Sequence, residues 1–167
     1  MPERKLIATL RTLHQGGVEF IVVGGLAAVL QGAPVDTFDV DIVHSRDAAN
    51  VARLLPVLDA LDAIFRMQPE RRLRPNASHL ASAGHLNLMT RYGPLDLLRT
   101  IGSNLAYEDL VPRSVELDIA EGVRMRVLDL ETLIAIKEEL GGEKDRAVLP
   151  TLRRTLEEKR KRPATSH

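Results

Sequence analysis

The chain of 167 residues contains no cysteine and no tryptophan, and it has only two tyrosines and three phenylalanines. Without cysteine it forms neither a disulfide nor a thiolate metal site, which is compatible with a reducing cytosol. Its 23 basic residues balance 23 acidic ones, so the total charge gives no sign of nucleic-acid binding. Any polynucleotide partner must therefore be held by a local patch, with few aromatic side chains for base stacking.

Long hydrophobic runs are also absent. No run approaches the roughly 18 apolar residues that a transmembrane helix needs, and the first residues lead into an amphipathic segment rather than a signal-peptide core. We therefore expect a cytoplasmic protein without a membrane partner. The length predicts a single domain over residues 1–158. Within it, we expect residues 1–100 to form the core and the site, and residues 101–158 to add a strand and helices. A basic flexible tail is expected at 159–167.

Hydrophobic periodicity predicts an α/β (α+β) fold, in which a small mixed β-sheet is flanked by helices and the C-terminal part is helical. Helices are expected at residues 3–14, 26–31, from Ser45 to Leu61, 130–139 and 143–159, and strands at 19–23, 38–43, 85–90, 94–98 and 123–128. Residues 66–84 contain four arginines and two prolines without a clear period, so we expect a loop there. The last helices are expected to cap a cleft.

Two acidic residues flanked by apolar ones, Asp39-Val40-Asp41-Ile42, are the most informative feature of the chain. Alternate side chains of a strand share one face, so the two carboxylates lie side by side while Val40 and Ile42 face the core. Adjacent carboxylates repel each other unless a cation lies between them. Hard oxygen ligands suit Mg²⁺, which commonly bridges acidic groups to substrate phosphates. The acid pair therefore indicates half of a magnesium site.

A glycine pair precedes these acids. Residues 18–23 form a short apolar run that ends at Gly24 and Gly25, and a helix is expected to begin just afterwards. A strand, a glycine turn and a helix N-terminus allow backbone N–H groups to approach a phosphate closely. Alone, a glycine pair is more often a plain turn and an Asp-x-Asp a solvated strand end, but their combination at this spacing favours a nucleotide site.

The segment Val23-Gly24-Gly25, a gap of thirteen residues, and Asp39-Val40-Asp41-Ile42 resembles the signature of the DNA polymerase beta-like nucleotidyltransferase superfamily. That superfamily carries a third acid on a later strand, and Asp96, which lies between two leucines, is the candidate here. The resemblance implies the nucleotidyltransferase fold. It also implies that Asp39, Asp41 and Asp96 are the catalytic residues and the ligands of one or two Mg²⁺ ions.

Within the superfamily, the chain is most similar to the small bacterial group that contains AbiEii-type toxins. The shared features are a hairpin with the third acid, a segment like Val127–Lys137 and a pair like Lys144-Asp145, so that the resemblance covers about residues 18–153. The nucleotide-binding residues that the motifs and this resemblance imply are Gly24, Gly25, Thr37, Lys137, Lys144 and Asp145. In this interpretation Lys137 and Lys144 contact phosphate, and Asp145 is the partner of Lys144.

Each of these residues also has a simpler interpretation. Lys137 fits an ordinary lysine that buries only its stem, Lys144 and Asp145 fit the solvated first turn of a helix, and Thr37 fits a cap of the turn before a strand. The chain departs from the group at one position, because Val35 stands where such proteins commonly carry an arginine. One phosphate contact of the group is therefore missing here.

Three functions are compatible with these observations. The first is transfer of a nucleoside monophosphate from a nucleoside triphosphate to a hydroxyl of an RNA, such as a tRNA end, or of a protein. The resemblance then implies a toxin with an antitoxin-like partner. The second, favoured by Val35, is a nucleotide-binding domain of the same fold that has lost catalysis and acts through a partner. The third is a transferase that uses Asp-x-Asp with a nucleotide-sugar donor, although there the motif normally follows a larger nucleotide-binding domain.

Overall fold

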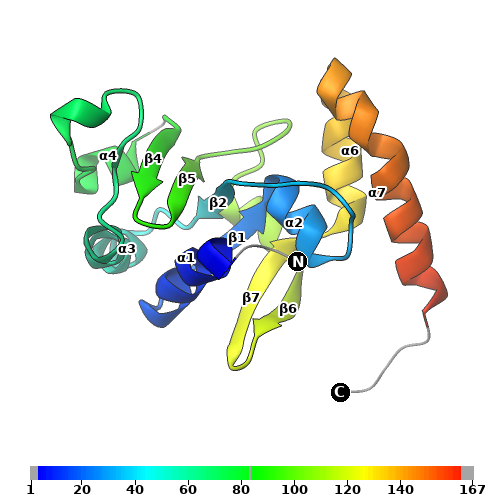
Figure 1. Cartoon of the computed structure of the whole chain (residues 1–167), viewed down its shortest axis with the longest axis horizontal. Helices are drawn as coiled ribbons and strands as arrows, with labels where there is room; N and C mark the ends of the chain where they lie inside the picture. Colours follow the sequence, from blue (N-terminus) through cyan, green and yellow to red (C-terminus); the bar gives the residue numbers. More distant parts are fainter. Residues whose placement is uncertain (1–3, 83, 163–167) are drawn as a thin grey trace.

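A mixed β-sheet runs through the molecule, and helices lie against it and at one end (Figure 1). The computed structural model describes residues 4–82 and 84–162. The strands are β1 Phe20–Val23, β2 Val40–His44, β3 Ile64–Phe65, β4 Leu86–Thr90, β5 Gly93–Leu98, β6 Ser114–Ala120 and β7 Val123–Leu128. Within the described residues they form one seven-stranded sheet in the order β3-β4-β5-β2-β1-β7-β6.

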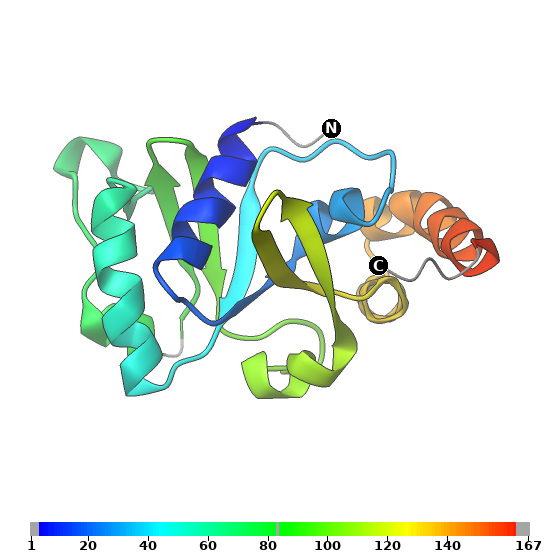
Figure 2. The same ribbon diagram turned by 90° about the horizontal axis from the view of Figure 1, so that it is seen from below.

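The helices form two groups around this sheet (Figures 1 and 2). They are α1 Arg4–Gln15, α2 Gly24–Leu30, α3 Ala48–Ala60, α4 Ala77–Ala81, α5 Tyr107–Leu110, α6 Leu130–Leu140 and α7 Glu143–Lys161, with short 3-10 helices η1 Pro69–Arg71 and η2 Val111–Arg113. Helix α1 contacts α3 beside the sheet. At the other end of the molecule, α6 packs against α7 and also contacts α2.

The local sequence explains the elements that carry the site. Strand β1 is Phe-Ile-Val-Val and is buried along its whole length, as expected for a central strand that is covered on both faces. Helix α6 begins at an N-cap, because the side chain of Asp129 accepts a hydrogen bond of 2.7 Å from the Thr132 N–H. It is capped at its C-terminal end by Gly141, whose φ of +61° is a left-handed conformation that favours glycine.

The directions of three central strands determine where the acids lie. Strand β2 runs antiparallel to β1 and parallel to β5. In this register Asp41 pairs with Val23 on one side and with Asp96 on the other. The end of β1, the start of β2 and the middle of β5 therefore meet at one edge of the sheet, and Gly24 follows directly from β1.

The predicted fold class is confirmed, because a mixed sheet is flanked by helices and the C-terminal part is helical. The predicted first helix, both strands of the hairpin and the two closing helices are all present within a few residues of their expected bounds. Among the described residues, no helix combines the length and the apolar character needed to cross a membrane.

Some predictions are corrected. Residues 66–84, expected to be a loop, contain η1 and α4, and strand β6 was not predicted at all. Asp39 lies one residue before β2 rather than inside it. Helix α7 continues to Lys161, so the start of the expected tail is helical, and there Arg160 forms an ion pair of 3.6 Å with Glu131 of α6. Residues 163–167 of that tail lie outside the described residues.

A buried amide joins α3 to the two strands that lead to the site. The Asn50 side chain is fully buried, and its Oδ1 accepts a hydrogen bond of 2.8 Å from the Glu19 N–H. Its Nδ2 donates to the carbonyl oxygens of Glu19 and Ser45 at 3.0 and 2.7 Å. One side chain thus forms hydrogen bonds with backbone groups just before β1 and just after β2. These bonds fix the start of β1 and the end of β2 relative to α3.

We expect Asn50→Ala to lower the free energy of unfolding by about 3 kcal/mol, because three hydrogen bonds of a buried side chain are lost and the Glu19 N–H loses its partner. Urea unfolding followed by circular dichroism measures this loss. Asn87→Ala is the control, because Asn87 is exposed on β4, and we expect it to change stability by less than about 0.5 kcal/mol. Equal effects of the two substitutions would contradict the role of Asn50.

Candidate active site

Two carboxylates lie next to each other across strands β2 and β5. Asp41 and Asp96 are directly paired in the parallel register, and the charge of Asp96 acts on the carboxylate of Asp41. Asp39 precedes Asp41 by two residues and is close enough to act on its charge. The structure therefore brings together all three acids that the sequence predicts, although their role as metal ligands stays a prediction.

The environment of Asp41 disfavours its charged form. Burial is the largest cause, followed by the charge of Asp96, the hydrogen bond with Asp96 and the charge of Asp39. Together they raise the pKa of Asp41 from 3.8 to about 7, while the charge of Arg66 acts in the opposite direction. A divalent cation would remove the repulsion that causes part of this shift, so these carboxylates suit a hard cation such as Mg²⁺.

Across residues 4–82 and 84–162, no three His, Cys, Asp or Glu side chains are arranged so that they could hold a metal ion together. The positive group that contacts the acids is the guanidinium of Arg66. Its Nη2 lies 2.9 Å from Oδ1 of Asp96, and its Nη1 donates a hydrogen bond of 3.0 Å to the Leu88 carbonyl oxygen. The sequence did not reveal this residue, because it is one of four arginines in an irregular segment and only the pairing of β3 with β4 brings it to the site.

The glycine turn lies directly against the acids. Gly24 has a φ of +67°, and a Cβ atom at this position would clash with Oδ2 of Asp41. A Cβ atom at Gly25 would lie 3.2 Å from Oγ1 of Thr37. The same hydroxyl is 3.5 Å from the Asp39 carbonyl oxygen, at the limit of a hydrogen bond. Gly24, Gly25 and Thr37 thus lie around the start of β2, and their role in binding phosphate stays a prediction.

A cavity of about 160 Å³ joins this turn to the C-terminal helices. Its lining includes Gly24 and Gly25, Val35, and the two lysines Lys137 on α6 and Lys144 on α7. Small-molecule sites usually enclose about 300 to 1,000 Å³, so the cavity is large enough for phosphate groups but not for a whole nucleotide. Val35 places an apolar side chain in this wall, at the position where the resemblance leads us to expect arginine.

The partner of Asp145 differs from the prediction. Its Oδ1 lies 3.1 Å from Nζ of Lys137, whereas the sequence predicts Lys144 as its partner. The reason is geometric, because the tight turn between α6 and α7 brings the first turn of α7 against the end of α6. Lys144 shares the cavity without this ion pair. Both lysines are therefore near the glycine turn, and one of them is held by a carboxylate.

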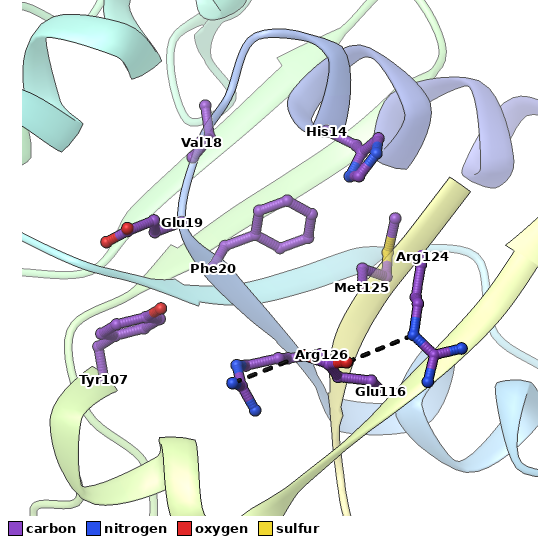
Figure 3. A pocket seen from close by; sticks show the side chains of 9 residues that line it. All are labelled: His14, Val18, Glu19, Phe20, Tyr107, Glu116, Arg124, Met125 and Arg126. Carbon is purple, nitrogen blue, oxygen red and sulfur yellow. Dashed lines mark hydrogen bonds and ion pairs between the residues drawn. The ribbon is translucent and has the colours of Figure 1, made fainter. Parts of the chain in front are cut away.

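A larger cavity, of about 390 Å³, lies at the opposite end of β1 (Figure 3). Phe20 and Tyr107 lie in its wall, together with Glu116, which forms ion pairs of 3.3 Å with Arg124 and 3.6 Å with Arg126. None of the predicted site residues lines this cavity. Its arginines are already paired with an acid, so it offers no strong site for a phosphate.

Strand order, the glycine turn and the paired acids together define a nucleotidyltransferase fold. Two solved structures agree with it: the lincosamide antibiotic adenylyltransferase LnuA, bound to lincomycin, and TM1012 from Thermotoga maritima, described as a candidate nucleotidyltransferase. LnuA has a TM-score of 0.62 and 14% identity, covering 92% of this chain and 97% of its own. TM1012 has a TM-score of 0.55 and 20% identity, covering 93% of this chain and 92% of its own.

At this identity the likeness shows the fold, and the substrate does not follow from it. No protein-family model matches the chain, and no curated protein matches it. The superfamily resemblance is thus supported at the level of the fold. The narrower resemblance to AbiEii-type toxins stays a prediction, because neither structural neighbour is described as such a toxin.

The raised pKa of Asp41 predicts how stability depends on pH without divalent cations. Because its pKa is about 7 in the folded chain and 3.8 ordinarily, the folded state binds more protons between these values. Stability should therefore fall as the pH rises from about 4 to 7 and level off above. We expect Asp41→Asn to unfold at higher temperature than the wild type at pH 8 in EDTA. The gain should be about 1 to 2 kcal/mol, reduced by solvent screening, and should vanish near pH 4.

Thermal unfolding from pH 4 to 8 measures this difference. Asp59→Asn is the matched control, because Asp59 is exposed on α3, and we expect its curve to follow the wild type. If Asp41→Asn were less stable than the wild type at pH 8, the carboxylate repulsion proposed for the metal-free site would be wrong.

Gly24→Ala tests the close approach of the turn to Asp41. Gly122, in the turn between β6 and β7, has a similar φ of +72° and open space around it. Gly122→Ala should lower the free energy of unfolding by only about 1 kcal/mol, the cost of a left-handed backbone for alanine. Gly24→Ala should cost about 3 kcal/mol, because the new methyl group also clashes with Oδ2 of Asp41. Chemical unfolding compares the two variants, and similar losses would show that Gly24 is needed for its backbone alone.

Proposed function

We propose that this protein is a Mg²⁺-dependent nucleotidyltransferase that transfers a nucleoside monophosphate from a nucleoside triphosphate to a hydroxyl of an RNA or a protein. The observation that carries the proposal is the direct pairing of Asp41 with Asp96 beside the Gly24 turn, in a chain with the nucleotidyltransferase fold. Two adjacent acids, one of them with a raised pKa, next to a left-handed backbone that favours glycine are costly unless they serve a bound group.

Each residue has a proposed role in the reaction. Asp39 and Asp41 would hold Mg²⁺, which supplies charge neutralisation for the triphosphate. The cavity between the glycine turn, Lys137 and Lys144 would bind the phosphates that leave. The acceptor oxygen forms a bond to the α-phosphorus, the bond from this phosphorus to the bridging oxygen breaks, and pyrophosphate leaves. Asp96 would take the proton of the acceptor hydroxyl.

The small volume of the cavity supports a divided nucleotide site. Its wall is formed by α2, by the segment before β2 and by α6 and α7, which are distant in sequence. Phosphate groups would occupy the cavity, while the sugar and base would extend from it toward the acids. Positioning of the phosphates by fixed donors accounts for much of the rate in phosphoryl transfer.

The acceptor is proposed from the resemblance to AbiEii-type toxins, which favours an RNA such as a tRNA end, or a protein. If that resemblance holds, an antitoxin-like partner that blocks the activity is expected. LnuA, the structural neighbour, is an adenylyltransferase for a lincosamide antibiotic. A small hydroxylated molecule is therefore the acceptor to test if neither macromolecule is labelled.

One observation favours a second candidate function. Val35 lies in the cavity wall, where an apolar side chain gives no contact to a phosphate. The cavity thus has Lys137 and Lys144 as its only cationic side chains among the described residues, and Lys137 is neutralised by Asp145. A nucleotide-binding domain that acts through a protein partner and does not catalyse transfer would need no further cation in this cavity, because no pyrophosphate leaves.

Incubation with each α-labelled nucleoside triphosphate, Mg²⁺ and total bacterial RNA or protein should label a macromolecule. We expect Asp39→Asn and Asp41→Asn to lower this labelling by about 100-fold or more, because each removes a charge that would hold the metal. Asp41→Asn is expected to be stable, so its loss of activity would not reflect unfolding. Asp59→Asn is the control and should keep the activity of the wild type.

The other outcomes separate the alternatives. Nucleotide binding without labelling of any RNA, protein or small hydroxylated acceptor would contradict the proposed enzyme and support the binding domain. Transfer from a nucleotide-sugar in preference to a triphosphate would support the third hypothesis of a sugar-handling transferase.

A further inference from the structure

The guanidinium of Arg66 is fixed between two strands beside the acids. Arg66 follows the edge strand β3, and its side chain crosses β4 to reach β5. One end of the guanidinium donates to the Leu88 carbonyl oxygen at 3.0 Å and the other lies 2.9 Å from Asp96. Two contacts from one planar group restrict the orientation of the guanidinium. Arginine is better suited than lysine to make such paired contacts.

This ion pair is not needed to hold the segment around Arg66 in place. The Arg66 N–H already donates a hydrogen bond of 2.9 Å to the Asn87 carbonyl oxygen. The neighbouring Phe65 N–H donates to the Leu73 carbonyl oxygen at 2.8 Å, and its ring packs edge-on against His79. The backbone is therefore anchored at Arg66 and at the residue before it. Arg66 and Asp96 are also partly exposed, at 30% and 15%, so a ligand can reach them.

The positive charge of Arg66 affects how many metal ions the three acids can bind. The three acids carry three negative charges when ionised, and Arg66 contributes one positive charge. Counting the protein side chains alone, the two remaining negative charges match one divalent cation. Without Arg66, one such ion would leave a carboxylate uncompensated, and Asp96 would have both oxygens available to a second ion.

We propose that the guanidinium of Arg66 takes the place of a second metal ion, so that the site binds one divalent cation together with its nucleotide. The inference rests on the proposed function. Asp39 and Asp41 hold the single ion, and Arg66 keeps Asp96 oriented toward the acceptor hydroxyl. Arg66 is thus a positioning residue, and it determines how many metal ions this site uses.

Native mass spectrometry of the full chain tests the proposal by counting ions. The probe is Mn²⁺ with the α,β-methylene analogues of the four ribonucleoside triphosphates, which bind without being cleaved. We expect one Mn²⁺ per nucleotide complex in the wild type and in Arg66→Lys, which keeps a positive charge. We expect two in Arg66→Ala and again one in Arg66→Ala combined with Asp96→Asn. Arg72→Ala, which removes an exposed ion pair with Asp62, should leave the count at one.

The outcomes are distinguishable. Two ions in the wild type, or an unchanged count of one in a folded Arg66→Ala, would overturn the role of Arg66 and leave the proposed function intact. A wild type that binds none of the four analogues with Mn²⁺ would overturn the proposed function and this inference together. Thermal unfolding of each variant shows that it is folded, and a drop in melting temperature with no change in ion count would identify a purely structural ion pair.

Discussion

The repulsion between Asp41 and Asp96 is the constraint on which the rest of the site depends. Parallel pairing of β2 and β5 fixes these carboxylates opposite each other, and the backbone cannot separate them without losing the register. The surrounding features are responses to this contact. Arg66 supplies a positive charge from one side, and the glycine turn leaves the space that the Asp41 carboxylate occupies on the other. Burial first, and then the charge of Asp96, raise the pKa of Asp41, so a proton on Asp41 eases the repulsion further in the free protein.

The same central strands also determine how the C-terminal helices complete the site. Strand β7 pairs with β1 in parallel, so the chain that leaves β7 enters α6 near the end of β1 that carries Gly24. Helices α6 and α7 then bring two lysines to the glycine turn, more than 100 residues away in sequence. The site is therefore divided into an acidic side built by the sheet and a basic side built by the helix pair. This division suits a substrate that carries negative charge at one end and a reacting centre at the other.

The acids and the glycine turn could be predicted because their signals are local. A strand shows its alternation within a few residues, and a glycine pair shows where the backbone turns. Arg66 and the ion pair of Lys137 with Asp145 could not be found in this way. Both depend on how separate elements pack, and the sequence does not show which of four arginines contacts the acids. Strand β6 did offer a signal, because Val115, Leu117 and Ile119 alternate with polar residues, but its acids pair with arginines of β7 and resemble a solvated segment.

The clash between a side chain at Gly24 and the carboxylate of Asp41 also has an evolutionary consequence. Two positions that compete for one volume cannot vary independently, so selection on the acid is also selection on the glycine. In a lineage that no longer needs the acid, Asp41 can shrink to serine or alanine, and the position of Gly24 then accepts asparagine, which tolerates its left-handed backbone. Loss of both residues together would therefore mark the descendants in which the acid at this edge of the sheet is no longer needed.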